Sequence, residues 1–476
     1  MDQKRIPLFE ALLAHRKREP HSFHVPGHKN GAVFSEYGAE LYRHLLSIDV
    51  TELTGLDDLH NPTGVIKQAE NLAADWYRSK QCFFLVGGST VGNLAMIMAT
   101  CKAGETVLVQ RNSHKSILNG LRLAKVHPIF LQPEFDEIAQ IPANLEEAFV
   151  LDTINKYPYA KALIITNPNY YGYSMSLESI IKEAHKHKMV VLVDEAHGAH
   201  FSHPSNFFPK SALEYGADIV VQSAHKTLPA MTMCSYLHYN SSLISLKKLT
   251  YYLQLLQSSS PSYPLMASLD LARHFLASIS EKDIEKTIFD IKTFKDDINK
   301  IPQLKVIKNK LYKIDPLKVT IQSCCKLSGY ELQQLLEEEG IYTELADRNN
   351  ILMVMPLLNT INLRRIGEII KYKLKDYGVI ERSTVTHRLF EKKCTSLALS
   401  YEDIEEIEEE VVPLTKSVGR IISEEITPYP PGVPLLVTGE QIEMEHIKYL
   451  YELKKVGAYL QGEDIHKVGV KVLKKP

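Results

Sequence analysis

The sequence lacks the features that mark membrane, secreted and nucleic-acid-binding proteins. Its longest clear apolar run, residues 94–101, is far shorter than the roughly 18 residues of a membrane-spanning helix. No apolar core of a signal peptide follows the first residues, so we expect a cytoplasmic protein. The 55 Lys and Arg residues nearly balance the 57 Asp and Glu residues, and this balance gives no general attraction for a nucleic-acid backbone.

Cysteine is scarce as well, with six residues in a chain of 476 and no Cys-x-x-Cys pair. We therefore expect neither a disulfide scaffold nor a structural zinc site. The composition that remains, 45% hydrophobic and 24% charged, is typical of a folded globular protein and excludes extensive disorder. At roughly 150 residues per domain, the length allows about three folding units.

Short apolar runs alternate with helical patterns through the first half of the chain. The expected strands are residues 82–86, 106–110, 126–131, 162–166, 189–193 and 218–222. Their runs of Val, Ile and Leu are continuous, which is typical of strands buried on both faces. The repeated order of strand and helix predicts an α/β fold with a large, mainly parallel sheet.

The segments outside this region predict the domain boundaries. Turn-forming residues dominate residues 1–60, which we expect to form an N-terminal arm. A long helical pattern at residues 281–300 would join a large α/β domain, residues 61–300, to a smaller C-terminal α/β domain, residues 301–476. Within the latter, the acidic segment 402–411 carries apolar residues at helical spacing and predicts a solvated helix.

An acid and a lysine follow two successive predicted strands. Asp194 ends one strand, and Lys226 comes 32 residues later, after the next. The carboxyl ends of parallel strands meet at one edge of a sheet, so both side chains are expected there. Such a lysine could form a Schiff base with pyridoxal phosphate, while the acid keeps the pyridine nitrogen protonated. A lysine is more often a surface charge, and spacing alone leaves both interpretations open.

A glycine turn offers a third anchor for that cofactor. Gly87, Gly88, Ser89 and Thr90 follow a predicted strand and open a helical pattern. Backbone N–H groups and the helix dipole could bind a phosphate there, and the two hydroxyls would add to it. Ser-Thr is also a common helix cap, so this signal is weak alone.

A competing interpretation of the strand-end acid is a helicase. Asp194-Glu-Ala-His197 matches the DEAH box, whose acids would hold magnesium and water. That function requires a phosphate loop ending in Gly-Lys-Ser or Gly-Lys-Thr. Neither tripeptide occurs in the sequence, which argues against the helicase.

Eight motifs, in order from about residue 5 to residue 465, resemble the Orn/Lys/Arg decarboxylases of the aspartate-aminotransferase fold (fold type I). They are His24-Val-Pro-Gly-His-Lys29, Gly55-Leu-Asp-Asp-Leu59, Gly88-Ser-Thr90, Arg111-Asn-Ser-His-Lys-Ser116, Asp194-Glu-Ala-His197, Ser223-Ala-His-Lys226, Ser260-Pro-Ser-Tyr263 and Pro430-Pro-Gly-Val-Pro434. The chain is similar to the shorter, biosynthetic-type members, because the arm motif begins at residue 24 and we expect no N-terminal wing domain.

The resemblance implies a role for each matching active-site residue. Lys226 is similar to the Schiff-base lysine, Asp194 to the pyridinium partner, and His114 to the histidine that stacks on the cofactor ring. His197 and His225 are similar to active-site histidines, and His225 is a candidate proton donor beside the phosphate.

The resemblance also implies phosphate ligands and a partner subunit. Ser89, Thr90 and Ser223 are similar to residues that bind the cofactor phosphate. Ser259 is similar to a residue that reaches the phosphate of the partner subunit. The resemblance therefore implies a homodimer or an assembly of dimers, with the active site at the dimer interface.

The implied reaction is α-decarboxylation of a basic amino acid, with arginine expected first, then lysine, then ornithine. It yields carbon dioxide and a polyamine precursor. A cationic substrate side chain needs an acidic partner, and the candidates are Glu52, Asp57, Asp58 and Glu440. Another fold type I reaction, such as transamination, would use the same lysine and aspartate and stays an alternative, as does a binding protein without turnover.

Overall fold

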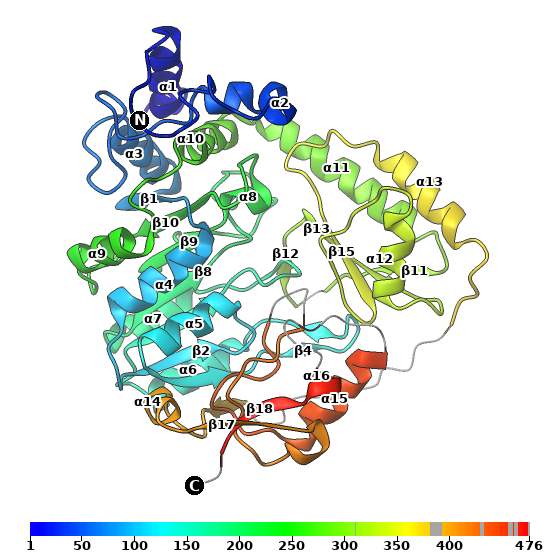
Figure 1. The fold of residues 1–476 in the computed structure, drawn as a ribbon. Helices are drawn as coiled ribbons and strands as arrows, with labels where there is room; N and C mark the ends of the chain where they lie inside the picture. The colour runs from blue at the N-terminus through cyan, green and yellow to red at the C-terminus, as the bar shows by residue number, and fades with distance from the viewer. Residues whose placement is uncertain (310, 381–392, 429–432, 456–459, 461–464, 475–476) are drawn as a thin grey trace. The chain divides into compact units, whose positions relative to one another are not determined.

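The computed structural model describes residues 1–309, 311–380, 393–428, 433–455, 460 and 465–474 (Figure 1). The chain forms two compact units: unit 1 comprises Met1–Thr100 and Val190–Ser280, and unit 2 comprises Cys101–Met189 and Glu281–Pro476. Residues 430–432 of the proline-rich motif lie outside the described residues. None of the helices in the described part of the chain combines the length and apolar character that crossing a bilayer requires.

Unit 1 contains four strands in the order β1-β10-β9-β8. Their bounds are β1 Gln81–Leu85, β8 Val190–Asp194, β9 Ile219–Gln222 and β10 Ser235–Tyr239. β8 and β9 are parallel, whereas β10 runs antiparallel to both β9 and β1. Every residue of β8 and β9 is buried, which explains their continuous runs of Val, Leu and Ile.

Seven helices accompany these strands within the described part of unit 1. They are α1 Pro7–Lys17, α2 Glu36–Leu46, α3 Val65–Tyr77, α4 Gly88–Thr100, α8 Ala224–Thr227, α9 Leu246–Leu256 and α10 Tyr263–Ser278. α4 approaches the sheet closely at Gly92, where an added Cβ would lie 2.7 Å from the side chain of Leu85 and 2.8 Å from that of Val221. Glycine at this position therefore lets the helix pack directly on β1 and β9.

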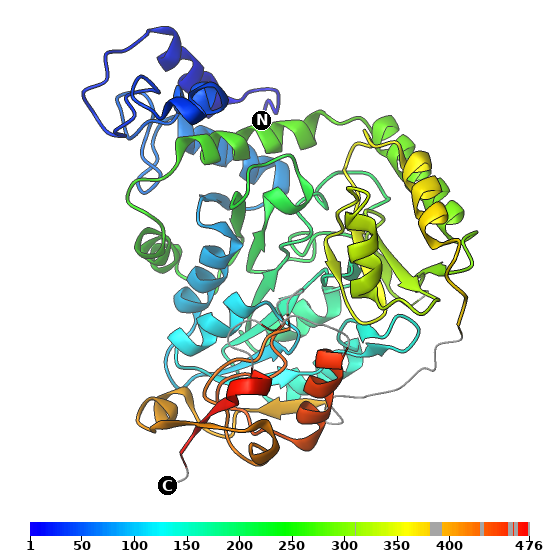
Figure 2. The same cartoon turned by 45° about the vertical axis from the view of Figure 1, so that its right-hand side comes forward.

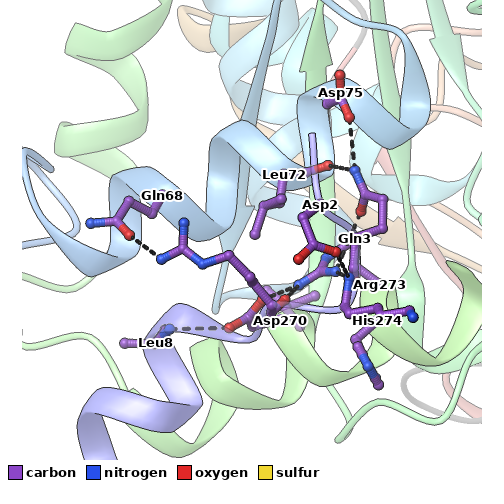
Figure 3. A network of polar contacts seen from close by, with 12 residues as sticks. Asp2, Gln3, Leu8, Gln68, Leu72, Asp75, Asp270, Arg273 and His274 are labelled. Atoms are coloured by element: carbon purple, nitrogen blue, oxygen red, sulfur yellow. Dashed lines mark hydrogen bonds and ion pairs between the residues drawn. The ribbon is translucent and has the colours of Figure 1, made fainter. Parts of the chain in front are cut away.

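A buried ion pair holds the start of the chain against α10 (Figure 3). Arg273 Nη2 lies 2.6 Å from Asp270 Oδ1, and both side chains are fully buried. Asp270 also accepts the N–H of Leu8, and Arg273 donates to the backbone carbonyls of Gln3 and Arg5. The added hydrogen bonds offset the cost of burying the two charges, and they fix the N-terminal segment on this helix.

In the described part of unit 2, one set of paired strands has the order β6-β2-β3-β16. Their bounds are β2 Thr106–Gln110, β3 His127–Leu131, β6 Ala162–Thr166 and β16 Cys394–Ser396. β2 is parallel to β3 and β6, and β16 adds an antiparallel edge. The helices between and after the parallel strands are α5 Lys115–Leu123, α6 Glu147–Lys156 and α7 Glu178–Lys186.

A second, antiparallel sheet of unit 2 has the order β11-β13-β15-β14. Its strands are β11 Leu304–Val306, β13 Lys318–Ser323, β14 Leu345–Ala346 and β15 Asn350–Val354, and it is accompanied by α11 Glu281–Ile298, α12 Gly329–Glu337 and α13 Leu363–Leu374. Figures 1 and 2 show α11 and α13 side by side. Two small pairs complete this region: β4 Phe135–Asp136 with β5 Ile141–Pro142, and β7 Tyr173–Ser174 with β12 Lys313–Ile314.

The C-terminal part of unit 2 has its own small core. Its elements are α14 Tyr401–Glu405, β17 Glu409–Val412, the 3₁₀ helix η1 Leu414–Lys416, α15 Met444–Lys455, α16 Ile465–Val468 and β18 Val470–Leu473. The predicted helix over residues 402–411 is wrong beyond Glu405. Residues 406–408 form neither helix nor strand, and residues 409–411 lie in β17, which pairs antiparallel with β18, so ladder hydrogen bonds replace the helical ones there.

The predicted α/β fold with a mainly parallel sheet is confirmed. Each of the six expected strands is present to within one residue at either end. β10 was not predicted, because its residues Ser235 and His238 interrupt the apolar pattern although both are fully buried. The long helix expected at residues 281–300 is α11.

Candidate active site

Lys226 lies in the one-turn helix α8, directly after β9. Its Nζ is 3.3 Å from His197 Nε2, and the lysine is half-buried. An Nζ–H that donates to Nε2 requires the imidazole to carry its own proton on Nδ1. The lysine and this histidine are therefore brought together from the ends of neighbouring strands.

Asp194 ends β8 and is almost completely buried. Its Oδ2 accepts a hydrogen bond from Asn93 Nδ2 at 2.9 Å, and its Oδ1 accepts the N–H of Ala196 at 3.1 Å. Asp194 is in register with Val221 of β9, so the strands that lead to Asp194 and Lys226 end at the same edge. Asn93, on α4, was not predicted, and only its contact with the acid identifies it.

The glycine turn and the segment before the lysine supply hydroxyl groups in the same unit. α4 begins at Gly88, whose φ of 78° suits glycine, and Ser89 and Thr90 follow in its first turn. Ser223 Oγ donates to Ser89 Oγ at 2.9 Å. The helix start and these hydroxyls form the kind of donor set that binds a phosphate.

His225 is held by the backbone of the following strand segment. Its Nδ1 lies 3.0 Å from the carbonyl oxygen of Cys234. Because a carbonyl only accepts, Nδ1 must carry the proton in this contact. Ser259 is exposed between α9 and α10.

His114 belongs to unit 2, where it follows β2 and caps the N-terminus of α5. Its Nδ1 accepts the N–H of Ser116 at 3.2 Å and lies 2.8 Å from Ser116 Oγ. The cap fixes one ring nitrogen, so the orientation of the imidazole is set by the start of the helix.

Two of the candidate substrate-binding acids, Asp57 and Glu440, each accept several hydrogen bonds. Asp57 accepts the N–H groups of Thr63, Gly64, Ile66 and Lys67, at 2.7–3.2 Å, and so caps α3. Glu440 is bound by both Nε and Nη2 of Arg111. Asp58 accepts the N–H of His60, and Glu52 is exposed.

A buried polar chain lies next to the strand ends, and sequence reasoning missed it. Glu195 accepts hydrogen bonds from Ser211 Oγ, the N–H of Ala212 and, at 3.4 Å, Gln222 Nε2. Gln222 Oε1 in turn lies 3.1 Å from Nε2 of the fully buried His238. Burial raises the pKa of Glu195 to about 8, although the hydrogen bonds to Ala212 and Ser211 oppose the shift.

Comparison with known proteins gives a family match over most of the chain. The model of the Orn/Lys/Arg decarboxylase major domain matches residues 6–310, and the model of the C-terminal domain of that family matches residues 382–474. No group of three His, Cys, Asp or Glu residues in the described ranges could hold a metal ion.

Curated relatives extend along nearly the whole sequence. The uncharacterized protein YaaO of Bacillus subtilis is 45% identical over 96% of each chain. Arginine decarboxylases of Halalkalibacterium halodurans and Bacillus subtilis are 35% and 34% identical, covering 97% and 98% of this chain and 96% of each relative. Two lysine decarboxylases, from Pseudomonas aeruginosa and Escherichia coli, are 22% and 24% identical.

Solved structures agree on the fold. The constitutive lysine decarboxylase of E. coli aligns with a TM-score of 0.80 at 21% identity, covering 99% of this chain and 82% of that one. Lysine decarboxylase A of Pseudomonas aeruginosa gives a TM-score of 0.82 at 19% identity, covering 98% and 80%. A serine palmitoyltransferase of Sphingomonas wittichii aligns with a TM-score of 0.55 at 16% identity, covering 73% and 85%. These likenesses confirm fold type I.

Proposed function

The chain belongs to the Orn/Lys/Arg decarboxylase family and is a pyridoxal phosphate-dependent decarboxylase of basic amino acids, and we propose that arginine is its preferred substrate. The curated arginine decarboxylases are more similar to the chain than the curated lysine decarboxylases are, which supports this choice. Lysine and then ornithine are the next candidates. The amine product would be a precursor of polyamines.

The residues of unit 1 fit the cofactor. A lysine and a buried carboxylate stand at the ends of two neighbouring parallel strands, and hydroxyls gather at the start of α4. The single observation that carries the assignment is the register of β8 with β9, which brings Asp194 and Lys226 to one edge. When bound, the cofactor supplies a sink for the electron pair left at Cα when carbon dioxide departs.

In this proposal Lys226 would hold the cofactor through its Nζ. His197, 3.3 Å from Nζ, accepts a hydrogen bond from the lysine and so helps to keep its nitrogen directed. After the bond from Cα to the carboxylate breaks, Cα needs a proton. Lys226 or His225 would deliver it; because the Nδ1 proton of His225 is donated to the carbonyl of Cys234, His225 would do so only as the imidazolium, giving its second proton from Nε2.

Asp194 would hold the proton on the pyridine nitrogen. The hydrogen bonds from Asn93 and from the N–H of Ala196 stabilise the ionised carboxylate in a buried place. They also orient the two oxygens, so the negative charge is in place before the reaction begins. Asn93 is therefore part of the proposed cofactor site as the residue that fixes this acid.

The remaining cofactor contacts are proposed by residue type and place. Ser89, Thr90 and Ser223 would bind the phosphate at the start of α4. His114 would stack on the ring, with its imidazole oriented by the cap of α5. Ser259, exposed before α10, would reach the phosphate of a partner subunit.

The substrate guanidinium would pair with an acid of the N-terminal arm. Asp57 is occupied as the cap of α3, and Glu440 is bound by Arg111, so Glu52 and Asp58 are the better candidates. After burial, the negative charges of Glu52, Asp58 and Asp57 raise the pKa of Tyr263. A carboxylate can grip a guanidinium bidentately, which suits arginine.

The direct test is incubation of purified protein with arginine, lysine, ornithine and the neutral analogue norleucine. We expect carbon dioxide and the corresponding amine, with arginine fastest. Norleucine should react far more slowly, because it leaves an acid of the site unpaired. Equal turnover of neutral and cationic amino acids, or a keto acid in place of carbon dioxide, would replace this proposal with an aminotransferase-type reaction.

We also propose that the protein is cytoplasmic and forms a homodimer or an assembly of dimers. Support for self-association comes from α2 in the N-terminal arm, where the apolar side chains of Tyr37 and Leu41 are almost fully exposed. Exposed apolar side chains in one short helix are typical of a surface that another protein covers.

A further inference from the structure

We propose that the C-terminal segment of unit 2 positions His114 through a buried ion pair between Arg111 and Glu440. This inference rests on the proposed contact of His114 with the cofactor ring. Arg111 and Glu440 are positioning residues: they would act through the β2–α5 loop, residues 111–114, and touch neither substrate nor cofactor. Glu440 lies within residues 382–474, which match the C-terminal domain of the family, so the inference gives that region a role in the active site.

The guanidinium of Arg111 is fully engaged by the C-terminal segment. Its Nε and Nη2 donate to the two carboxylate oxygens of Glu440, at 3.2 and 2.9 Å. Nη1 and Nη2 also donate to the backbone carbonyls of Pro434 and Leu435, at 2.8 and 3.0 Å. The group lies 5.4 Å from the centre of the Phe130 ring, so an aromatic face adds to its hold.

Both partners of the ion pair are buried, with 3% of the Arg111 side chain and 10% of the Glu440 side chain exposed. Glu440 Oε2 also accepts the N–H of Val437 at 2.9 Å, which closes the turn that carries the acid. Removing one charge would leave the other buried without its partner, at a high cost. The pair therefore fixes the start of the β2–α5 loop to one turn of the C-terminal segment.

The rest of the loop has little freedom to separate His114 from Arg111. The N–H of Arg111 donates to the carbonyl of Leu131 at 2.9 Å, which extends the pairing of β2 with β3. Ser113 Oγ donates to the carbonyl of Gln110 at 2.8 Å. His114 then enters the cap of α5. A displacement of Arg111 would thus be passed to the imidazole.

The same C-terminal segment makes a second contact just after the loop, at Lys115. Lys115 Nζ lies 3.6 Å from Glu425 Oε2, and β16 pairs with β3, the strand next to β2. The C-terminal segment therefore contacts the chain on both sides of His114, at Arg111 before it and at Lys115 after it. Contacts on both sides of His114 restrict the position of its backbone, which supports a positioning role for the C-terminal segment.

The test compares Arg111→Lys with a matched control, Glu405→Gln. Lysine keeps the charge but cannot make the forked contact. The control removes the exposed ion pair of Lys125 with Glu405, 2.7 Å long, which also joins the region of α5 to the C-terminal segment. Two readouts are measured on the full chain: backbone hydrogen exchange over residues 111–118 in the apoprotein, and the dissociation constant for pyridoxal phosphate.

We expect faster exchange in Arg111→Lys and cofactor binding weakened about tenfold, the effect of losing one hydrogen bond to a charged group. Glu405→Gln should match the wild type in both. If circular dichroism shows that Arg111→Lys does not fold, the same two measurements are made on Glu440→Asp, which keeps both charges. Exchange and affinity equal to those of the control would overturn the inference.

A His114→Ala variant separates this inference from the proposed function. If His114→Ala weakens cofactor binding while Arg111→Lys does not, the ion pair is structural only and the inference fails alone. If His114→Ala leaves cofactor binding unchanged, the assignment of His114 to the ring fails, and the positioning role falls with it.

Discussion

Asp194 and Glu195 are adjacent acids, both buried, with very different surroundings. The amide of Asn93 and the N–H of Ala196 serve the ionised form of Asp194. For Glu195, burial dominates and raises the pKa to about 8. Asp194 ends β8 at the edge that leads to Lys226, whereas Glu195 is bound by Ser211 and Ala212, so Asp194 is the acid suited to pair with a protonated pyridine nitrogen.

Replacing Asp194 by Asn should therefore reduce kcat about a hundredfold or more, while cofactor still binds. The amide keeps the size of the side chain but removes the charge. Asp218→Asn is the matched control, since Asp218 is also buried but accepts the N–H of Val191 at the other end of β8. Steady-state kinetics and the cofactor absorption spectrum are the measurements; equal losses in both variants would show a general effect of burying an amide.

Glu70 provides a prediction about pH. Its carboxyl is buried on α3 and accepts the N–H of Phe84 at 3.1 Å, and burial raises its pKa from 4.5 to about 8. The folded state therefore favours the protonated form, so its contribution to stability is complete below pH 4.5 and is lost as the pH rises toward 8.

Glu70→Gln should remove this dependence, because the amide stays neutral. We expect the variant and the wild type to unfold at similar temperatures near pH 5, and the variant to unfold a few degrees higher at pH 9. Thermal unfolding at the two pH values measures this. A wild-type advantage that is the same at both pH values would show that Glu70 is ionised in the fold.

Asp57 was a candidate for binding the substrate, but in the structure it caps the start of α3. Asp57, which has a φ of 71°, accepts four backbone N–H groups from residues 63–67. Asp57→Ala should lower the free energy of unfolding by about 1–2 kcal/mol. The KM of the folded variant for arginine should change little. Denaturant unfolding measures the loss of stability, and steady-state kinetics measure the KM. A selective rise in that KM would instead return Asp57 to the substrate site.

Helices and strands could be predicted from the sequence where the local pattern of apolar residues alone determines the secondary structure. β8 and β9 are buried on both faces, so their apolar runs identified them without knowledge of the neighbours. β10 was missed because its polar residues are satisfied by distant partners, such as Gln222 for His238. Residues 402–411 have helical spacing, but pairing with β18, about 60 residues later, decides the conformation of their second half.

At the scale of the whole molecule, the strand-end residues were within reach of sequence reasoning and the long-range pairs were not. Asp194 and Lys226 follow successive strands, so the topology of a parallel sheet predicts their common edge. Arg111 and Glu440 are 329 positions apart, and no local signal connects them. The division into an arm, residues 1–60, and domains at residues 61–300 and 301–476 stays a prediction.

The proposed homodimer can be tested on the intact chain. Light scattering should give at least twice the 54.0 kDa of one chain, and the assembly should survive dilution, because obligate dimers bury more than about 2,000 Å². Tyr37→Ser combined with Leu41→Ser should weaken self-association if α2 lies in the interface. A fully active monomer of the wild type would exclude the dimer and the role of Ser259.

The central claim is that Lys226 carries the cofactor, and borohydride reduction tests it most directly. Reduction fixes pyridoxal phosphate irreversibly to the nitrogen that holds it, and mass spectrometry of the digested protein locates the modified lysine. We predict the label on the peptide that contains Lys226, together with loss of the visible absorption band, and no label at that position in Lys226→Arg. Labelling of another lysine in the wild type, or a wild-type protein that binds no cofactor, would contradict the account.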